Sequence, residues 1–367
     1  MSATYLLDGV SAASSNSSIL SSNSHPTSPP PTPNAASAGH TDAIWAVRWA
    51  NRAQGGQVVV TGSADHTIKI WNPASVSTPA RTVRPPKSLG IVGLDIDKSP
   101  EGASYFVSNS VDSVVSRYSL DGVQEGRKQL GPAESWGLSL NPRQAVMATA
   151  GNEGKVKVMS ASTEDFGNEL ASLDASGSFG SAVRYSNGGN LLAVASETGY
   201  VTLFDSETGS LVSTFPAHSA PIRSMTFTSS LLITASDDKR VNVFDLRALT
   251  AASTGAAGGG GASRRGQVAS LGGHEGWVVS VEARNERLLA SGSADGTIKL
   301  FDLSAPSSAL STLRDHSGDV WSLAWAPETG SAAPVEGLGG ASAGLGGGRL
   351  VSAGEDGALR WWRGGGT

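Results

Sequence analysis

The sequence predicts an all-β protein, a seven-bladed β-propeller that is closed by an N-terminal strand completing the last blade. Three observations predict this fold. A short phrase recurs seven times, its copies are spaced like propeller blades, and hydrophobicity alternates with a period of two inside each copy.

The recurring phrase consists of an apolar strand, a pair of small or hydroxyl residues, an acidic turn, and an alternating strand that ends in a large side chain. Its copies end at Trp71, Tyr118, Met159, Phe204, Phe244, Phe301 and Trp362, with successive intervals of 47, 41, 45, 40, 57 and 61 residues. A four-stranded blade takes about 40–45 residues. The two long intervals contain Gly/Ala/Ser-rich inserts at 249–266 and 328–348, and without them both shrink to about 40. Such tracts bury too little apolar surface to order themselves, so we expect flexible inserts there.

Each element of a copy follows from local chemistry. In the stretch from Thr67 to Trp71, small or charged residues alternate with large apolar ones, as in a strand with two different faces. The acidic turn before it predicts a hairpin. Further strands are expected before several copies, for example at 44–49 and 319–325, which gives four strands per blade.

The last copy ends too near the C-terminus to supply its own fourth strand. An open sheet edge would invite aggregation, so we expect Thr4–Leu7 to pair there and close the ring. The Ser/Pro-rich remainder of the arm, up to residue 38, predicts a disordered linker, and residues 364–367 a short tail. The propeller itself is expected over residues 39–363.

Composition excludes several classes of function. The chain has no cysteine, a net charge of −5 and only 16 % charged residues, and its apolar runs are shorter than a membrane helix requires. We therefore expect no metal, no cofactor, no membrane partner, no direct contact with nucleic acid and no small-molecule substrate.

The repeats resemble the WD-repeat family over residues 39–363. The residues that carry the resemblance are Gly39-His40 with Trp71-Asn72 and Gly273-His274 with Phe301-Asp302, and weaker copies are Ala217-His218 with Phe244-Asp245 and Asp315-His316 with Trp362-Arg363. The resemblance implies a propeller that works as a protein-interaction scaffold.

Serine or threonine, histidine and aspartate occur together, which are the residue types of a catalytic triad. The combination recurs in several repeats, whereas an enzyme needs its triad once, and no irregular acidic or histidine cluster breaks the repeat frame. The family resemblance instead implies a buried hydrogen-bond network that fastens each blade. In the first blade the hydroxyl partner is left open between Thr61 and Ser63. The residues predicted for this network are His40, Ser63, Asp65, Trp71, His218, Asp238, His274, Asp295, His316 and Asp356.

A ring of large side chains is the candidate binding site. The fifth residue after the opening histidine is Trp45, Arg223, Val279 or Trp321, and strand alignment adds Trp136 and Ser181. This position falls at the start of the innermost strand, near the mouth of the central channel. The tryptophans either plug the channel as core or contact a partner, and their amphipathic character favours contact. The residues predicted to bind a partner are Trp45, Trp136, Phe179, Arg223, Trp277 and Trp321.

Five stretches also resemble the WD-repeat subunits of superkiller complexes, namely 40–49, 135–142, 154–158, 217–227 and 276–281. This resemblance implies a cytoplasmic scaffold that binds a helical-repeat subunit and an RNA helicase and supports exosome-mediated 3′-to-5′ mRNA decay. The N-terminal segment and the two inserts depart from that pattern. The alternatives are a nuclear scaffold, in a transcription-elongation complex or in the initiation of meiotic recombination, and, more remotely, a propeller enzyme.

Overall fold

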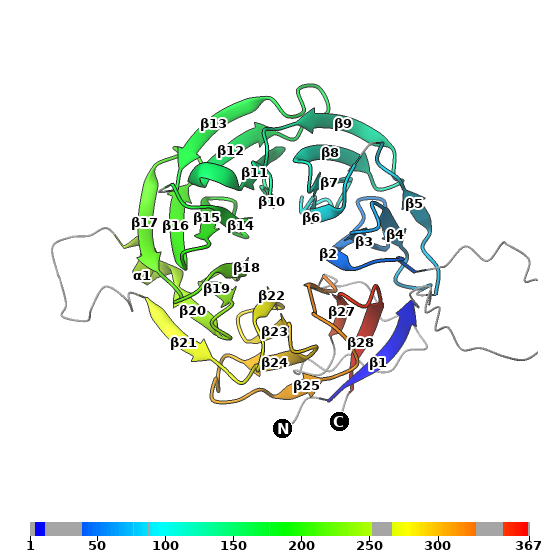
Figure 1. The fold of residues 1–367 in the computed structure, drawn as a ribbon, viewed down its shortest axis with the longest axis vertical. Coiled ribbons are helices and arrows are strands. Elements are labelled where there is room, and N and C mark those ends of the chain that lie inside the picture. The colour runs from blue at the N-terminus through cyan, green and yellow to red at the C-terminus, as the bar shows by residue number, and fades with distance from the viewer. Residues whose placement is uncertain are drawn as a thin grey trace, which may run out of the picture.

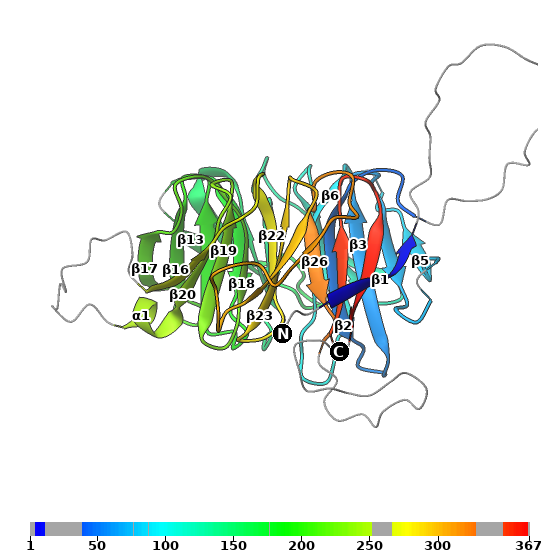
Figure 2. The ribbon, with the colours of Figure 1, turned by 90° about the horizontal axis from the view of Figure 1, so that it is seen from below.

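Seven four-stranded antiparallel sheets stand around a central channel in the computed structural model, which confirms the predicted seven-bladed propeller (Figure 1). The structure describes residues 4–11, 39–75, 77–86, 88–175, 177–251, 266–327 and 348–365. The side view shows a flat disc whose innermost strands run through its thickness (Figure 2). In the part of the chain that is described, no helix is long and apolar enough to cross a membrane.

Within each blade the strands are given from the channel outward. Blade one contains β2 (Ile44–Asn51), β3 (Gln57–Ser63), β4 (Ile68–Trp71) and β5 (Arg81–Val83). Blade two contains β6 (Ile91–Ile96), β7 (Tyr105–Ser110), β8 (Val114–Ser119) and β9 (Gln124–Gln129). Blade three contains β10 (Gly137–Leu140), β11 (Val146–Ala150), β12 (Lys155–Ser160) and β13 (Glu169–Asp174), with a 3₁₀ turn at Asn152–Gly154. Blade four contains β14 (Gly180–Tyr185), β15 (Leu191–Ser196), β16 (Tyr200–Asp205) and β17 (Leu211–Pro216).

The remaining blades follow the same order. Blade five contains β18 (Ile222–Phe227), β19 (Leu231–Ser236), β20 (Val241–Asp245) and β21 (Gln267–Leu271). Blade six contains β22 (Val278–Ala283), β23 (Leu288–Ser293), β24 (Ile298–Asp302) and β25 (Ser311–Leu313). Blade seven contains β26 (Ser322–Trp325), β27 (Arg349–Ala353), β28 (Leu359–Gly365) and, outermost, β1 (Thr4–Ser11).

The N-terminal strand closes the ring, as the sequence predicts. Strand β1 runs antiparallel to β28, with Leu6 opposite Arg363 and Leu7 opposite Trp362. Figure 1 shows the blue β1 lying along the red β28, so that the two ends of the chain meet in one sheet. The strand is longer than the expected Thr4–Leu7 because, after a register shift at Leu7/Gly9, pairing continues to Ser11. The predicted linker beyond it lies outside the described residues.

A short helix, α1 (Leu246–Thr250), was not expected from the sequence. The Asp245 side chain caps it by accepting the backbone N–H of Arg247, and Leu249 is buried in the core. The first two residues of the predicted insert 249–266 therefore belong to the folded ring. Residues 252–265 and 328–347, which form most of the two inserts, lie outside the described residues.

The core lies between neighbouring blades. The cluster between blades one and seven joins Val47, Trp49 and Trp71 to Val351 and Trp361. Trp49 and Trp361 meet edge to face, with ring centroids 5.5 Å apart. Successive side chains of a strand point to opposite faces of its sheet, so large side chains pack against both neighbouring blades. This packing fixes the innermost strands around the channel.

Candidate interaction site at the channel mouth

A chain of hydrogen bonds fastens the loop that leads into blade one. Nδ1 of His40 lies 2.9 Å from Oδ2 of Asp65, and its Nε2 lies 2.7 Å from Oγ1 of Thr61. The Trp71 indole donates to the same Thr61 hydroxyl at 2.9 Å. Because a carboxylate only accepts, Nδ1 carries the proton, and Nε2 of the neutral ring accepts from Thr61. The histidine is completely buried, so both ring nitrogens need these partners.

The same arrangement occurs in three more blades. His218 contacts Asp238 and Thr234, both at 2.8 Å. His274 contacts Asp295 at 2.9 Å and Ser291 at 2.8 Å. His316 lies 3.1 Å from Asp356 and 2.8 Å from Ser352, whose hydroxyl also accepts the Trp362 indole. Each of these sets joins the entering loop of a blade to the strands of the same blade, so the repeated device fastens individual blades. In the described ranges, no three His, Cys, Asp or Glu side chains are grouped to hold a metal.

The structure gives Thr61 and Ser63 different places in the hydrogen-bond network of blade one. The hydroxyl bonded to His40 is that of Thr61, the other residue that the sequence left open. Ser63 lies at the end of β3, where its Oγ accepts the backbone N–H of Asp65 and donates to the carbonyl of Asp42. It therefore shapes the turn, while Thr61 lies two residues deeper in the strand, within reach of the Trp71 indole.

Burial and bonding shift the pKa values of these pairs. Burial lowers the pKa of His40, His274 and His316, although their aspartate partners oppose the shift. Burial raises the pKa of Asp65, but the bonds from His40, Thr67 and the Thr41 N–H outweigh it and hold that pKa far below its usual value. The histidine is thus neutral and the aspartate ionised at neutral pH.

Replacing Asp65 with alanine is expected to lower the free energy of unfolding by about 1–3 kcal/mol, because His40 and the Thr41 N–H lose their buried acceptor. Asp121→Ala removes a carboxylate that is 79 % exposed and serves as the control. Urea denaturation of both variants measures the difference. Equal, small losses in the two variants would contradict the proposed role.

Acidification is expected to destabilise the propeller. Unfolded histidines titrate near pH 6.5, and folded His40, His274 and His316 resist protonation, so the unfolded state binds more protons below that pH. Stability from the aspartates, whose folded pKa is lowered, is present above the unfolded pKa of 3.8 and is lost as the pH falls below it. Urea denaturation from pH 7.5 to 4 should show a falling free energy of unfolding. A constant or rising value would contradict these signs.

One bulge in each of five innermost strands builds the predicted ring. The register of β2 shifts between Ile44 and Ala46 and leaves Trp45 without a Cα partner. The same shift falls at Val92, Ser181, Arg223 and Val279. In blades three and seven the matching residues, Trp136 and Trp321, directly precede the innermost strand. Bulges re-aim side chains, and here the five bulge residues join Trp136 and Trp321 at the channel mouth.

A cavity of about 610 Å³ opens inside this ring; we call it the upper cavity. All six residues counted to this position line it: Trp45, Trp136, Ser181, Arg223, Val279 and Trp321. Residue 90 is a glycine, and a Cβ at that position would lie 2.7 Å from the Trp45 ring. The glycine therefore leaves room for the Trp45 side chain. The His-loop face, meaning the face at which the innermost strands begin, therefore has an aromatic opening within the size range of ligand pockets.

The side chains around this opening are exposed and anchored. Trp136 is 44 % exposed and meets Phe179 edge to face at 6.0 Å between ring centroids. Trp277 is 52 % exposed and lies beside the guanidinium of Arg223, which binds Asp237 through two contacts of 2.8 and 2.6 Å. The Trp321 indole donates to Glu355 at 2.6 Å. Phe179 and Trp277 do not line the upper cavity but flank it, so the six predicted residues form one surface.

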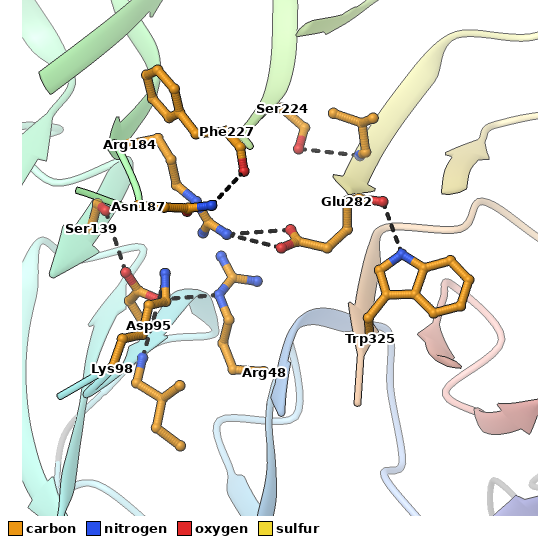
Figure 3. A network of polar contacts seen from close by, with 12 residues as sticks. Arg48, Asp95, Lys98, Ser139, Arg184, Asn187, Ser224, Phe227, Glu282 and Trp325 are labelled. Carbon is orange, nitrogen blue, oxygen red and sulfur yellow. Dashed lines mark hydrogen bonds and ion pairs between the residues drawn. The ribbon is translucent and has the colours of Figure 1, made fainter. Parts of the chain in front are cut away.

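Sequence reasoning missed a second ring deeper in the channel. Three residues after the bulge position lie Arg48, Asp95, Arg184 and Glu282, which Figure 3 shows converging from four blades together with Lys98. Arg184 contacts both oxygens of Glu282 at 3.2 and 3.3 Å. The sequence feature that could have revealed this second ring is one charged residue inside each of four strands that are otherwise largely buried.

The fold and the aromatic mouth define a propeller of the protein-interaction scaffold class. The chain belongs to the WD-repeat family. The family described as "WD domain, G-beta repeat" matches residues 32–72, 265–302 and 307–363, and the "Anaphase-promoting complex subunit 4 WD40 domain" matches 172–230.

Two relatives agree with this assignment. The chain is 30 % identical to the WD repeat-containing protein SL1-17 of Schistosoma mansoni over 212 residues, which are 57 % of this chain and 68 % of that protein. It is 29 % identical to the meiotic recombination protein rec14 of Schizosaccharomyces pombe over 117 residues, or 31 % of this chain and 38 % of that protein.

Proposed function

We propose that this chain is the WD-repeat scaffold of a superkiller-like assembly and that it binds a helical-repeat subunit through the His-loop face. The observation that carries the proposal is the aromatic ring around the upper cavity. Trp45, Trp136 and Trp321 come from blades far apart in the sequence, and all three line the upper cavity from the start of the innermost strand of their blade. Large aromatic side chains around a concave opening are typical of binding hot spots.

The surface suits an amphipathic peptide or helix. The exposed apolar side chains Leu89, Val111, Trp136 and Trp277 belong to loops at the His-loop face. Arg223 and Glu355 add one charge of each sign at the cavity wall. A partner segment would place an apolar side chain into the upper cavity and meet these polar groups at its edge.

The identity of the assembly rests on the sequence resemblance of five stretches, which lie in four of the seven blades. In this proposal the assembly also contains an RNA helicase and feeds the cytoplasmic exosome, while the chain itself performs no chemistry. A second candidate is a nuclear scaffold in meiotic recombination, which the similarity to rec14 favours.

Affinity purification of the tagged full chain, followed by mass spectrometry, tests the proposal. Recovery of a helical-repeat protein together with an RNA helicase is the expected result. Recovery of recombination factors or transcription factors in their place would overturn the superkiller assignment. A tagged sample in which the chain is first unfolded by heat controls for partners that bind exposed apolar surface.

A further inference from the structure

The lower half of the channel holds more cations than carboxylates. Arg48, Lys98 and Arg184 converge there on Asp95 and Glu282 (Figure 3). A cluster of this kind inside a protein is costly unless each charge has a partner of its own.

One carboxylate serves two of the cations. Oδ1 of Asp95 lies 3.4 Å from Nε of Arg48 and 3.5 Å from Nζ of Lys98. The same carboxylate also accepts the backbone N–H groups of Ile96 and Leu140 and is completely buried. Glu282 pairs with Arg184. The three cations therefore share two carboxylates, and one positive charge in the cluster has no carboxylate of its own.

A second cavity of about 170 Å³, which shares Arg48, Arg184 and Glu282 with the wall of the upper cavity, gives these cations room for a ligand; we call it the lower cavity. Arg48, Lys98 and Arg184 all line it, and Arg284 adds a fourth cation. The side chains of Lys98 and Arg48 are 35 % and 21 % exposed, so the channel interior reaches them. Burial lowers the pKa of Lys98 and repulsion from Arg184 lowers it further, although Asp95 and Glu282 oppose the shift.

We propose that the lower cavity binds a small oxyanion of the phosphate class, held by Arg48, Lys98 and Arg184. The guanidinium groups match phosphate oxygens in shape, and the lysine supplies a mobile point charge. With Arg284 counted, the lining carries four cations against the two carboxylates of the cluster, which matches a divalent anion. The ligand is either a free phosphate or pyrophosphate, or the terminal phosphate of a small ester. Arg48 and Arg184 also line the upper cavity, so the site adjoins the cavity that the partner surface surrounds.

Isothermal titration of the full chain with pyrophosphate, inorganic phosphate and glucose 6-phosphate tests the proposal. We expect one anion per chain and an affinity that falls as the salt concentration rises. If pyrophosphate or phosphate binds and glucose 6-phosphate does not, the ligand is a free anion. If glucose 6-phosphate binds equally well, the site accepts the terminal phosphate of an ester. Absence of binding for all three would overturn the proposal.

Variants tie the binding to the cluster. Lys98→Met should weaken anion binding at least tenfold, and Lys98→Arg should retain most of it. Lys155→Met removes a surface cation that is 57 % exposed and is the matched control, with no expected change. Circular dichroism of each variant verifies that the melting temperature is kept. Equal binding by the folded Lys98→Met variant and the wild type would contradict the assignment.

Discussion

Deletion of residues 1–11 lowers the melting temperature by about 10 °C or more. The deletion removes the whole ladder between β1 and β28, in which seven residue pairs are in register. At about 0.5–1.5 kcal/mol for each net hydrogen bond, the loss is on the order of 5 kcal/mol. It also leaves β28, which carries the buried Trp361 and Trp362, as an open edge.

Thermal unfolding followed by circular dichroism measures this effect. A synthetic peptide of residues 1–11, added in excess, should restore part of the lost stability by mass action, whereas a scrambled peptide should not. An unchanged melting curve would show that the N-terminal strand does not close the ring. The truncated chain should also aggregate more readily than the full chain, which light scattering detects.

The triple variant Trp45→Ala, Trp136→Ala and Trp321→Ala keeps its fold and loses its partner. The three side chains line the upper cavity and are half-buried or exposed, while neighbouring blades pack through other residues such as Trp49 and Trp325. Removal of hot-spot tryptophans costs about 2 kcal/mol or more each in binding, so the affinity should fall by at least a hundredfold. Partner recovery in affinity purification, together with the melting curve, checks both halves of the prediction.

A control variant removes the same number of exposed apolar side chains elsewhere. Leu170, Leu211 and Val268 are exposed on the outer strands β13, β17 and β21, away from the channel. Their combined replacement by alanine should leave partner recovery unchanged. If the control loses the partner and the tryptophan variant keeps it, the binding surface lies on the outer strands.

The fold could be predicted from the sequence because each blade repeats the same local chemistry. Hydrophobic alternation, acidic turns and a large terminal side chain recur in every copy, and β1 supplies the fourth strand of the last blade. Helix α1 escaped prediction because five residues are too few to display a helical period. The extra length of β1 escaped because pairing resumes after its irregularity at Leu7/Gly9.

The candidate site could be predicted only in part. Counting five residues from the opening histidine located Trp45 and Trp321, because the loop between the histidine and the innermost strand has the same length in both blades. Thr61 and Ser63 lie on the same face of β3, two residues apart, so alternation alone does not separate them. The charged ring joins one residue from each of four blades. A charged residue in one apolar strand, such as Arg48 or Asp95, is a signal only when the four strands are aligned with one another.

Site-specific photocrosslinking tests the central claim, that partners dock on the His-loop face, most directly. A photoreactive amino acid is placed at the position of Trp136 in one sample and at the position of Leu211 in another, both exposed. The partner should crosslink from position 136 and not from position 211. Crosslinking from position 211 alone would contradict the account.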